Sequence, residues 1–247
     1  MNANRETRAQ AEMDLNADVG EGGAQDEELF AAGITSANIA CGAHAGDAGT
    51  MAKSCALAAT HGVMIGAHPG YADRPNFGRR AIVLSNADLA QLLEAQLREL
   101  AGCAARVGRK LAHVKPHGAL YHALNNDPSA AETLLAIMAR CVPKAALFGP
   151  PAGALRDAAA RAGCVFVPEG FIDRGYLPDG RLVPRGEPGD VLERGDEITA
   201  QTLAQARAGH VRTLCVHGDG PQAVRWLQLA RAALLAEGFR IAPPGRV

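Results

Sequence analysis

The sequence predicts an α/β protein folded as one parallel (β/α) barrel. Short β-rich runs alternate with longer amphipathic stretches from one end of the 247-residue chain to the other, which is the pattern of repeated βα units. Seven or eight such units follow one another without a break in composition, and this favours a single closed or nearly closed barrel. A doubly wound sheet is the alternative. We expect residues 1–12 to form a flexible leader and residues 13–247 to form a single barrel domain.

The predicted strands are short runs of apolar and β-branched residues bounded by turn residues. In chain order they cover residues 13–18, 36–40, 63–67, 111–115, 145–148, 165–168 and 213–217, with a weaker eighth at 240–242. Side chains alternate between the two faces of a strand, so Asp14, Asn16 and Asp18 share one face of the first strand. The apolar residues between them face the helices. The first strand therefore turns a polar face to the inside of the barrel.

The predicted helices carry their own start and stop signals. Residues 85–88 (SNAD) resemble a capping box ahead of a helix over 89–107, and Gly108 follows as a stop. Asp127 is a suitable N-cap for a helix over 128–141, whose first residue is proline. Further helices are expected over residues 50–61, 153–162, 199–208 and 221–237.

One long stretch, from Glu169 to about Asp190, has no periodicity and is rich in glycine, proline and arginine. Loops of this length in compact domains are usually functional. We expect this segment to act as a lid over the site.

Composition and charge exclude several classes of function. The chain is 48% hydrophobic and 21% charged, which is typical of a globular protein rather than a disordered one. Its 25 Lys and Arg against 26 Asp and Glu leave a net charge of -1, so no basic surface for nucleic acid or an anionic membrane is indicated. Six dispersed cysteines without a C-x-x-C pair indicate reduced thiols. We expect a cytoplasmic protein that binds neither nucleic acid nor membrane.

Polar residues gather where the predicted strands end. Ligands of parallel βα folds bind at the carboxyl ends of the strands, and four of these ends carry a histidine. They are His44, His68, His117 and His217. A single histidine after a strand is more often a packed loop residue than a functional one, but four at one end of a barrel indicate a site. Lys115 shares a strand face with His117 and points the same way.

Two further groups of residues have open interpretations. Asp18, His44 and His68 are suited to a metal site of two histidines and one carboxylate, and equally to hydrogen bonding with a polar ligand. The pair Arg79 and Arg80 is suited to clamping a carboxylate or phosphate, and equally to lying solvated at the surface. The sequence has no P-loop, no dinucleotide-binding glycine motif after a strand and no nucleophile elbow.

Seven motifs spread over most of the chain carry a family resemblance. They are DLNADVGE (14–21), TSANIACGAHAGD (35–47), GVMIGAHPGY (62–71), FGRR (77–80), HVKPHGALY (113–121), EGFIDRGY (169–176) and CVHGD (215–219). Together they resemble the family of 5-oxoprolinase A subunits, also called the LamB/YcsF family of lactam-utilisation proteins. The resemblance implies a seven-stranded βα barrel related to the polysaccharide deacetylases.

The resemblance also implies a function. A member of this family acts with two partner subunits, of B and C type, to open the lactam 5-oxoproline (pyroglutamate) to L-glutamate while ATP is hydrolysed to ADP and phosphate. The implied cofactor is ATP with Mg²⁺, held by this chain or by a partner, and a bound divalent metal is a further candidate. A five-membered lactam is a stable amide, so its opening requires an activated carbonyl, which phosphorylation of the amide oxygen supplies.

From this resemblance follow roles for the polar residues. We expect Asp18 or Glu169 to be the general base for water, His117 the general acid at the lactam nitrogen, and Lys115 the cation that faces developing negative charge. The remaining expected substrate-binding residues are Asp14, Asn16, Asn38, His44, Arg79, Arg80, Asp173, Arg174 and His217.

The chain departs from the family pattern around the expected pocket. Ala17 stands where a cysteine is usual, Ala43 where an aromatic residue usually precedes the histidine, and Asn76 where a glycine is usual. The segment after Glu21 is short and lacks an aromatic residue. Loss of aromatic side chains widens a pocket, so a lactam that differs from 5-oxoproline or is larger is an alternative substrate. Two other functions also stay open: a metal-dependent amide or deacetylase-type hydrolase that needs no ATP, and a non-catalytic protein that binds substrate for the enzyme.

Overall fold

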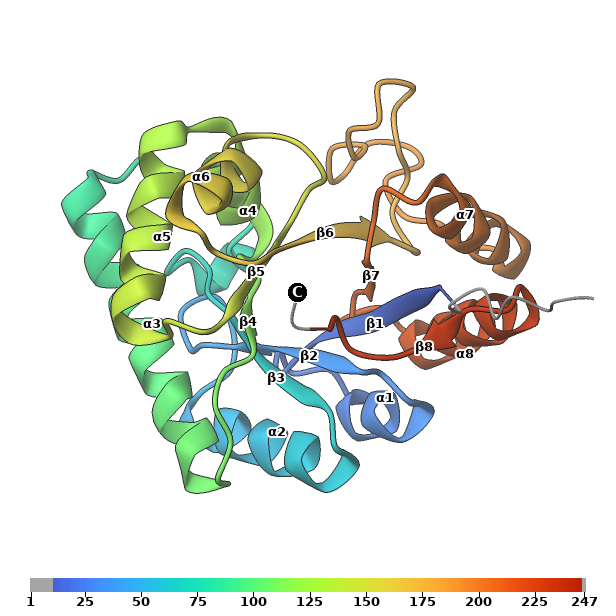
Figure 1. Cartoon of the computed structure of the whole chain (residues 1–247), viewed down its shortest axis with the longest axis horizontal. Coiled ribbons are helices and arrows are strands. Elements are labelled where there is room, and N and C mark those ends of the chain that lie inside the picture. Colours follow the sequence, from blue (N-terminus) through green and yellow to red (C-terminus); the bar gives the residue numbers. More distant parts are fainter. Residues whose placement is uncertain (1–10, 246–247) are drawn as a thin grey trace, which may run out of the picture.

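The strands form a closed parallel barrel in the computed structural model, which describes residues 11–245 (Figure 1). The barrel strands are β1 (Glu12–Val19), β2 (Ser36–Ala40), β3 (Met64–His68), β4 (His113–Val114), β5 (Ala146–Gly149), β6 (Phe166–Phe171) and β7 (Thr213–Val216). Strand β1 pairs with both β2 and β7, which closes the ring. The prediction of one parallel barrel is confirmed, and the doubly wound alternative is wrong. Residues 1–10 of the predicted leader lie outside the described residues, and Glu12 belongs to β1.

The strand registers bring side chains from different strands into common layers. Asp18 of β1 pairs with Asn38 of β2, Asn38 with Gly66 of β3, and Gly66 with His113 of β4. Gly66 is the small member of this layer because a Cβ there would lie 1.9 Å from Nε2 of His113. The missing side chain of Gly66 therefore gives the His113 imidazole its place inside the barrel.

The helices cover the outside of this barrel. They are α1 (Asp26–Ala32), α2 (Ala48–His61), α3 (Asn86–Arg106), α4 (Gly118–Asn126), α5 (Pro128–Cys141), α6 (Ala154–Ala162), α7 (Gly195–Ala208) and α8 (Ala223–Ala236), with the 3-10 helix η1 (Arg74–Asn76). Both predicted caps are confirmed: Ser85 Oγ accepts a hydrogen bond from the backbone N–H of Asp88, and Asp127 Oδ1 accepts one from that of Ser129. Helices α1 and α4 were not predicted.

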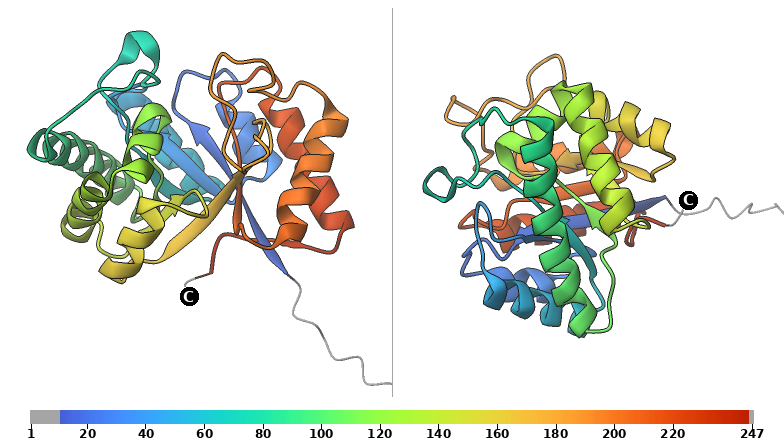
Figure 2. Two further views of the ribbon diagram at one scale, coloured as in Figure 1. Left: turned by 90° about the horizontal axis from the view of Figure 1, so that it is seen from above. Right: turned by 90° about the vertical axis from the view of Figure 1, so that its left-hand side faces the viewer.

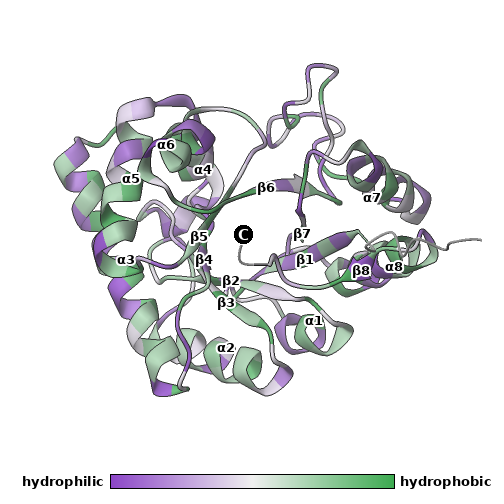
Figure 3. Cartoon of the chain, viewed as in Figure 1, coloured by the Kyte–Doolittle hydropathy of each residue, from purple (hydrophilic) through white to green (hydrophobic). Residues whose placement is uncertain are grey.

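An apolar layer joins the helices to the strands. Leu93, Leu97 and Leu100 of α3 are fully buried, and their spacing places them on one face of that helix. Burying each such leucine contributes about 2 kcal/mol to folding. Trp226 of α8 is 6% exposed and belongs to the same core. Figure 3 shows hydrophilic segments on the outward surfaces of the helices, as this arrangement requires.

The two long loops after β3 and β6 lie at one end of the barrel, whereas β8 (Arg240–Ile241) and the start of β1 lie at the opposite end (Figure 2). The expected eighth strand is thus a two-residue strand that pairs with β1 at Glu12 and Met13. The end with the long loops is the carboxyl end of the strands, where the polar motifs were expected to meet. None of the helices in residues 11–245 is both long enough and apolar enough to cross a membrane.

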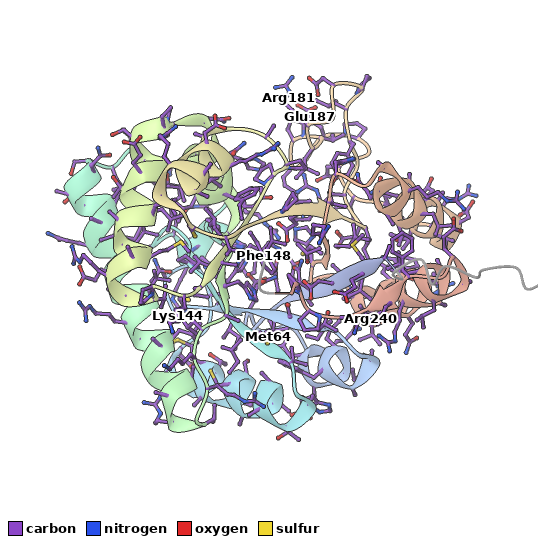
Figure 4. All side chains as sticks on the ribbon, viewed as in Figure 1. Met64, Lys144, Phe148, Arg181, Glu187 and Arg240 are labelled. Atoms are coloured by element: carbon purple, nitrogen blue, oxygen red, sulfur yellow. The ribbon has the colours of Figure 1, made fainter. Side chains whose placement is uncertain are left out.

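The predicted strand at 165–168 is too short. Strand β6 continues to Phe171 because Glu169, Gly170 and Phe171 pair with β7. Glu169 therefore stands on a barrel strand and not in the loop. The loop that follows folds on itself through bridges between Arg174 and Val191 and between Tyr176 and Leu182. Its outer end, with Arg181 and Glu187, stands away from the barrel (Figure 4), and its action as a lid stays a prediction.

Candidate active site

The lowest polar layer inside the barrel is built around Asp14. Its carboxylate accepts hydrogen bonds from Thr35 Oγ1 (2.6 Å), Ser36 Oγ (2.8 Å) and Thr213 Oγ1 (2.5 Å). Burial raises the pKa of Asp14 to about 6, although the hydroxyl donors act in the opposite direction. These hydroxyls already take up both carboxylate oxygens, and Asp14 lies four residues before Asp18 on the strand. Asp14 thus supports the layers above it.

Above this layer, a buried ammonium group links three strands. Lys115 Nζ lies 2.8 Å from Asp18 Oδ1 and 3.1 Å from Glu169 Oε1, and it also lies 2.8 Å from Cys215 Sγ. Burial alone would lower the pKa of Lys115, but the two carboxylates hold it well above its ordinary value. Burial alone would raise the pKa of Asp18, but His68 and Lys115 hold it well below its ordinary value. Asp18 is therefore a carboxylate and Lys115 an ammonium at neutral pH.

Two asparagines orient the Asp18 carboxylate. Asn38 Nδ2 donates to Asp18 Oδ1 (2.8 Å) and to Asn16 Oδ1 (2.6 Å). Asn16 Nδ2 donates in turn to Glu169 Oε1 (3.1 Å). His113 Nε2 lies 2.7 Å from Asn38 Oδ1, an oxygen that only accepts, so this nitrogen carries the proton. Burial lowers the pKa of His113 to about 3, and the neutral ring stacks on Phe148 in the middle of the barrel (Figure 4).

At the mouth of the barrel, three histidines and a glutamate form what we call the His–Glu cluster: Glu21, His44, His68 and His117. Their potential ligand atoms all lie within 4.8 Å of one another. Glu21 Oε1 lies 2.9 Å from His44 Nε2, 3.2 Å from His117 Nδ1 and 3.6 Å from His68 Nε2. Asp18 Oδ2 adjoins the cluster at 3.4 Å from His68 Nε2. The three residues expected to form a metal set are thus close together, and Glu21 and His117 join them.

Glu21 was not among the predicted site residues. Strand alternation stops short of it, because Gly20 turns the chain with a φ of 75° directly after β1. Burial alone would raise the pKa of Glu21, but its contacts with His117 and His44 hold it below its ordinary value. Its position at the end of the motif 14–21 was the available signal.

The rim of the site carries a second ionisable pair. Asp173 accepts hydrogen bonds from the backbone N–H of His217 (2.8 Å) and from its Nδ1 (2.9 Å). Burial would raise the pKa of Asp173, but His217 holds it below its ordinary value. The His217 ring stacks against Phe171 with centroids 5.4 Å apart. The structure therefore couples the start of the long loop to the end of β7.

The three predicted anion-binding arginines have different surroundings. Arg79 Nη2 lies 2.5 Å from Asp219 Oδ2, and its guanidinium stands over the Phe77 ring at the mouth of the site. Arg80 is exposed. Arg174 donates to the carbonyl oxygens of Val183 and Asp190, so it holds the long loop together. Of the three, Arg79 is the one that the structure brings beside the His–Glu cluster.

One departure from the family pattern lies outside the pocket. Ala17 is fully buried in the apolar core between strands and helices, whereas its neighbours Asn16 and Asp18 form the polar interior. Ala43 precedes His44 at the barrel mouth and is half-buried. The change at Ala17 therefore does not bear on the shape of the site, whereas Asn76 directly precedes Phe77, whose ring contacts His44 and His117.

The fold and the site together define a parallel (β/α) barrel protein with its polar site at the carboxyl end of the strands. The catalytic domain of a peptidoglycan N-acetylglucosamine deacetylase from Eubacterium rectale shares the fold, with a TM-score of 0.56 and 11% identity over 99% of this chain and 93% of that one. A lactam utilization protein from Thermus thermophilus is far more similar, with a TM-score of 0.85 and 33% identity over 94% of this chain and 99% of that one.

Sequence comparison makes the assignment specific. The LamB/YcsF family model matches residues 13–247. A protein from Nocardia farcinica that is named as the A subunit of 5-oxoprolinase is 44% identical over 242 residues, which cover 92% of this chain and 96% of that protein. The chain therefore belongs to the LamB/YcsF family.

Proposed function

We propose that this chain is the A subunit of an ATP-dependent 5-oxoprolinase. With two partner subunits, of B and C type, it opens 5-oxoproline to L-glutamate as ATP is hydrolysed to ADP and phosphate. The 44% identity to the Nocardia farcinica protein of that name supports this proposal. The structural observation that carries it is the buried Lys115 ammonium between the carboxylates of Asp18 and Glu169, because lactam opening needs both a cation and a base at one carbon atom.

The chemistry accounts for the use of ATP. The lactam oxygen takes the γ-phosphoryl group of ATP, and a water then adds to the activated carbon. The ring C–N bond breaks as its electron pair and a proton go to nitrogen, which leaves an acyl phosphate. A second water releases phosphate and the glutamate carboxylate. We place ATP and its Mg²⁺ in a partner protein, since the sequence of this chain has no P-loop or dinucleotide-binding motif.

The interior residues have roles that follow from their contacts. Lys115 faces the oxygen on which negative charge develops, and Asp18 or Glu169 takes the proton of the attacking water. When its ring carries both protons, His117 gives the one on Nδ1 to the leaving nitrogen, while its Nε2–H stays bonded to the carbonyl oxygen of Phe77. Arg79, at the mouth, binds the substrate carboxylate. The lower residues Asp14, Asn16 and Asn38 hold these groups in place.

A second candidate function is a metal-dependent amide hydrolase that needs no ATP. The observation that favours it is the His–Glu cluster, whose four residues offer one oxygen and three nitrogen atoms to a single ion. A third candidate, a non-catalytic protein that presents substrate to a partner, would need none of the interior charges for turnover.

Reconstitution separates these candidates. Glutamate release from 5-oxoproline is measured for this chain mixed with its two partner proteins, with ATP, without ATP and with this chain omitted. The proposal predicts release only with ATP and only with this chain present. Release without ATP would favour the metal-dependent hydrolase. If Asp18→Ala retains substrate binding but the assembled enzyme loses turnover, a merely presenting role is excluded.

A further inference from the structure

We propose that the His–Glu cluster binds one divalent transition-metal ion. The ligand atoms are Oε1 of Glu21, Nε2 of His44, Nε2 of His68 and Nδ1 of His117, from four segments at the carboxyl end of the barrel. The proposal concerns the ion and its ligands, so it holds for either enzymatic function considered above.

The tautomers of two histidines carry the argument. His68 Nδ1 lies 2.7 Å from the carbonyl oxygen of Lys115, and His117 Nε2 lies 2.8 Å from that of Phe77. A carbonyl oxygen only accepts, so each of these outer nitrogens carries the ring proton. In the neutral rings the inner nitrogens, His68 Nε2 and His117 Nδ1, therefore both carry lone pairs.

These two inner nitrogens face each other at 3.0 Å. Two lone pairs at that distance repel, and a cation shared by both nitrogens, either a metal ion or a proton, removes the repulsion. An outer N–H bonded to a backbone carbonyl is also the usual way in which a protein fixes the tautomer and the ring orientation of a metal-binding histidine. The two rings are thus prepared as ligands by bonds on their far sides.

The spacing of the cluster suits a small ion. Ligand atoms about 2.0–2.2 Å from a tetrahedral Zn²⁺ lie roughly 3.4 Å from one another. Glu21 Oε1 is 3.2 Å from His117 Nδ1 and 3.6 Å from His68 Nε2, close to that edge length. The distance from Glu21 to His44 Nε2 is 2.9 Å, a hydrogen-bond length that opens slightly when an ion replaces the proton.

His44 can bind the ion through Nε2 once its ring proton moves to Nδ1. That nitrogen is buried and has no hydrogen-bond partner within residues 11–245, so the shift breaks the contact with Glu21 and leaves the Nδ1–H unpaired, a cost that the bound ion must offset. The backbone makes room for the ring: a Cβ on Gly70 would lie 2.5 Å from His44 Nδ1, and one on Gly78 would lie 2.8 Å from His44 Cβ. Stacking on His117, with centroids 3.8 Å apart, holds the ring in position.

The donor set selects the kind of ion. Three imidazole nitrogens and one carboxylate oxygen suit Zn²⁺, Co²⁺ or a similar transition metal, whereas Mg²⁺ and Ca²⁺ prefer oxygen ligands. Such an ion supplies a Lewis acid beside the substrate carbonyl when bound. Asp18 then stands next to the ion, 3.4 Å from His68 Nε2, where it is placed to hold a water. His117 is then a ligand, and its proposed role as general acid falls away.

Metal binding by the isolated chain tests the proposal without any reaction. Chelator-treated protein is titrated with Co²⁺, and binding is followed by the visible absorption of the ion and by elemental analysis. We expect one ion per chain in the wild type. His68→Gln and Glu21→Gln should weaken binding by about 100-fold or more, since each removes a ligand. His61→Gln, at the exposed end of α2, is the matched control and should bind as the wild type does.

Circular dichroism checks that the variants are folded. If His68→Gln does not fold, the test depends on Glu21→Gln, which keeps the size of the side chain. Two results would overturn the proposal. In one, folded wild type binds no Co²⁺ or Zn²⁺, which would mean that a proton shared by the histidines is the cation. In the other, the ligand variants bind the ion as tightly as His61→Gln does. Neither result depends on ATP, so the proposed 5-oxoprolinase activity is tested separately.

Discussion

Lys115 Nζ lies within 3.1 Å of both Asp18 Oδ1 and Glu169 Oε1, and the three side chains are at most 3% exposed. Asp18 and Glu169 belong to β1 and β6, Lys115 directly follows β4, and these three strands are not neighbours in the sheet, so the ammonium group bridges the barrel interior. A buried charge without a partner costs several kcal/mol, which makes the three groups dependent on one another for stability. The same arrangement places a cation and two bases at one point of the barrel interior.

Asp14 should make stability depend on pH. Its pKa is raised by burial from 3.8 to about 6, so the folded protein holds the proton more tightly than the unfolded chain does. The stability that this proton gives is complete below about pH 4 and is lost as the pH rises through about 6. The shift corresponds to about 3 kcal/mol.

Asp14→Asn has no such titration. Between pH 4 and pH 7, the free energy of unfolding of the variant should therefore rise by about 2 kcal/mol relative to that of the wild type. Urea unfolding at several pH values in this range measures the difference. A difference that stays constant with pH would show that Asp14 does not hold the proton in the folded protein.

Gly66→Ala should disrupt the barrel interior. The added Cβ would lie 1.9 Å from His113 Nε2, and the ring cannot retreat because it stacks on Phe148. We expect the free energy of unfolding to fall by about 3 kcal/mol or more, because overpacking and a broken buried hydrogen bond act together. Thermal unfolding of the variant and the wild type measures this difference.

Gly102→Ala is the control for this change. Gly102 lies within α3, and nothing lies within 4 Å of the position that its Cβ would take. Alanine at this position should stabilise the helix by about 0.5–1 kcal/mol. Equal effects of the two substitutions would contradict the packing that we describe for Gly66.

Arg79→Gln should weaken substrate binding rather than the chemical step. Arg79 binds the substrate carboxylate in the proposed function, in both the ground state and the transition state, so KM should rise by about 10-fold or more while kcat changes little. Its pair with Asp219 is about one third exposed and should contribute at most about 1 kcal/mol to stability.

The matched control is Arg109→Gln, in the exposed turn before β4 at the opposite end of the barrel. Steady-state kinetics of the assembled enzyme compare the two variants. A fall in kcat with unchanged KM for Arg79→Gln would place this arginine in the chemical step.

The barrel and most of the site could be predicted because local rules determine them. Helix α5 has the predicted bounds, since its Asp127 cap and its first-position proline are purely local signals. The polar face of β1 follows from alternation alone, and the structure places Asp18 in the barrel interior as that alternation predicts. Family resemblance added the interpretation of these residues as a lactam site.

The remaining features depend on contacts between distant segments. Helix α1 has seven residues and no side-chain cap, so its sequence carried a weak signal. Strand β6 reaches Phe171 only because β7 pairs with it. Arg174 turns to the carbonyl oxygens of its own loop, and no sequence pattern distinguishes that position from an anion clamp. The facing nitrogens of His68 and His117 likewise become visible only in three dimensions.

The central claim is that Lys115 acts on the lactam, and one measurement tests it most directly. ATP-dependent glutamate release is compared for assembled enzymes that carry Lys115→Met or, as control, Lys144→Met at the exposed surface position labelled in Figure 4. Lys115→Gln, which removes the charge but keeps a hydrogen-bond donor beside the two carboxylates, is added in case Lys115→Met does not fold. The account predicts a fall in kcat of about 100-fold or more for the folded Lys115 variant and wild-type kcat for Lys144→Met. Equal rates for the two positions would contradict it.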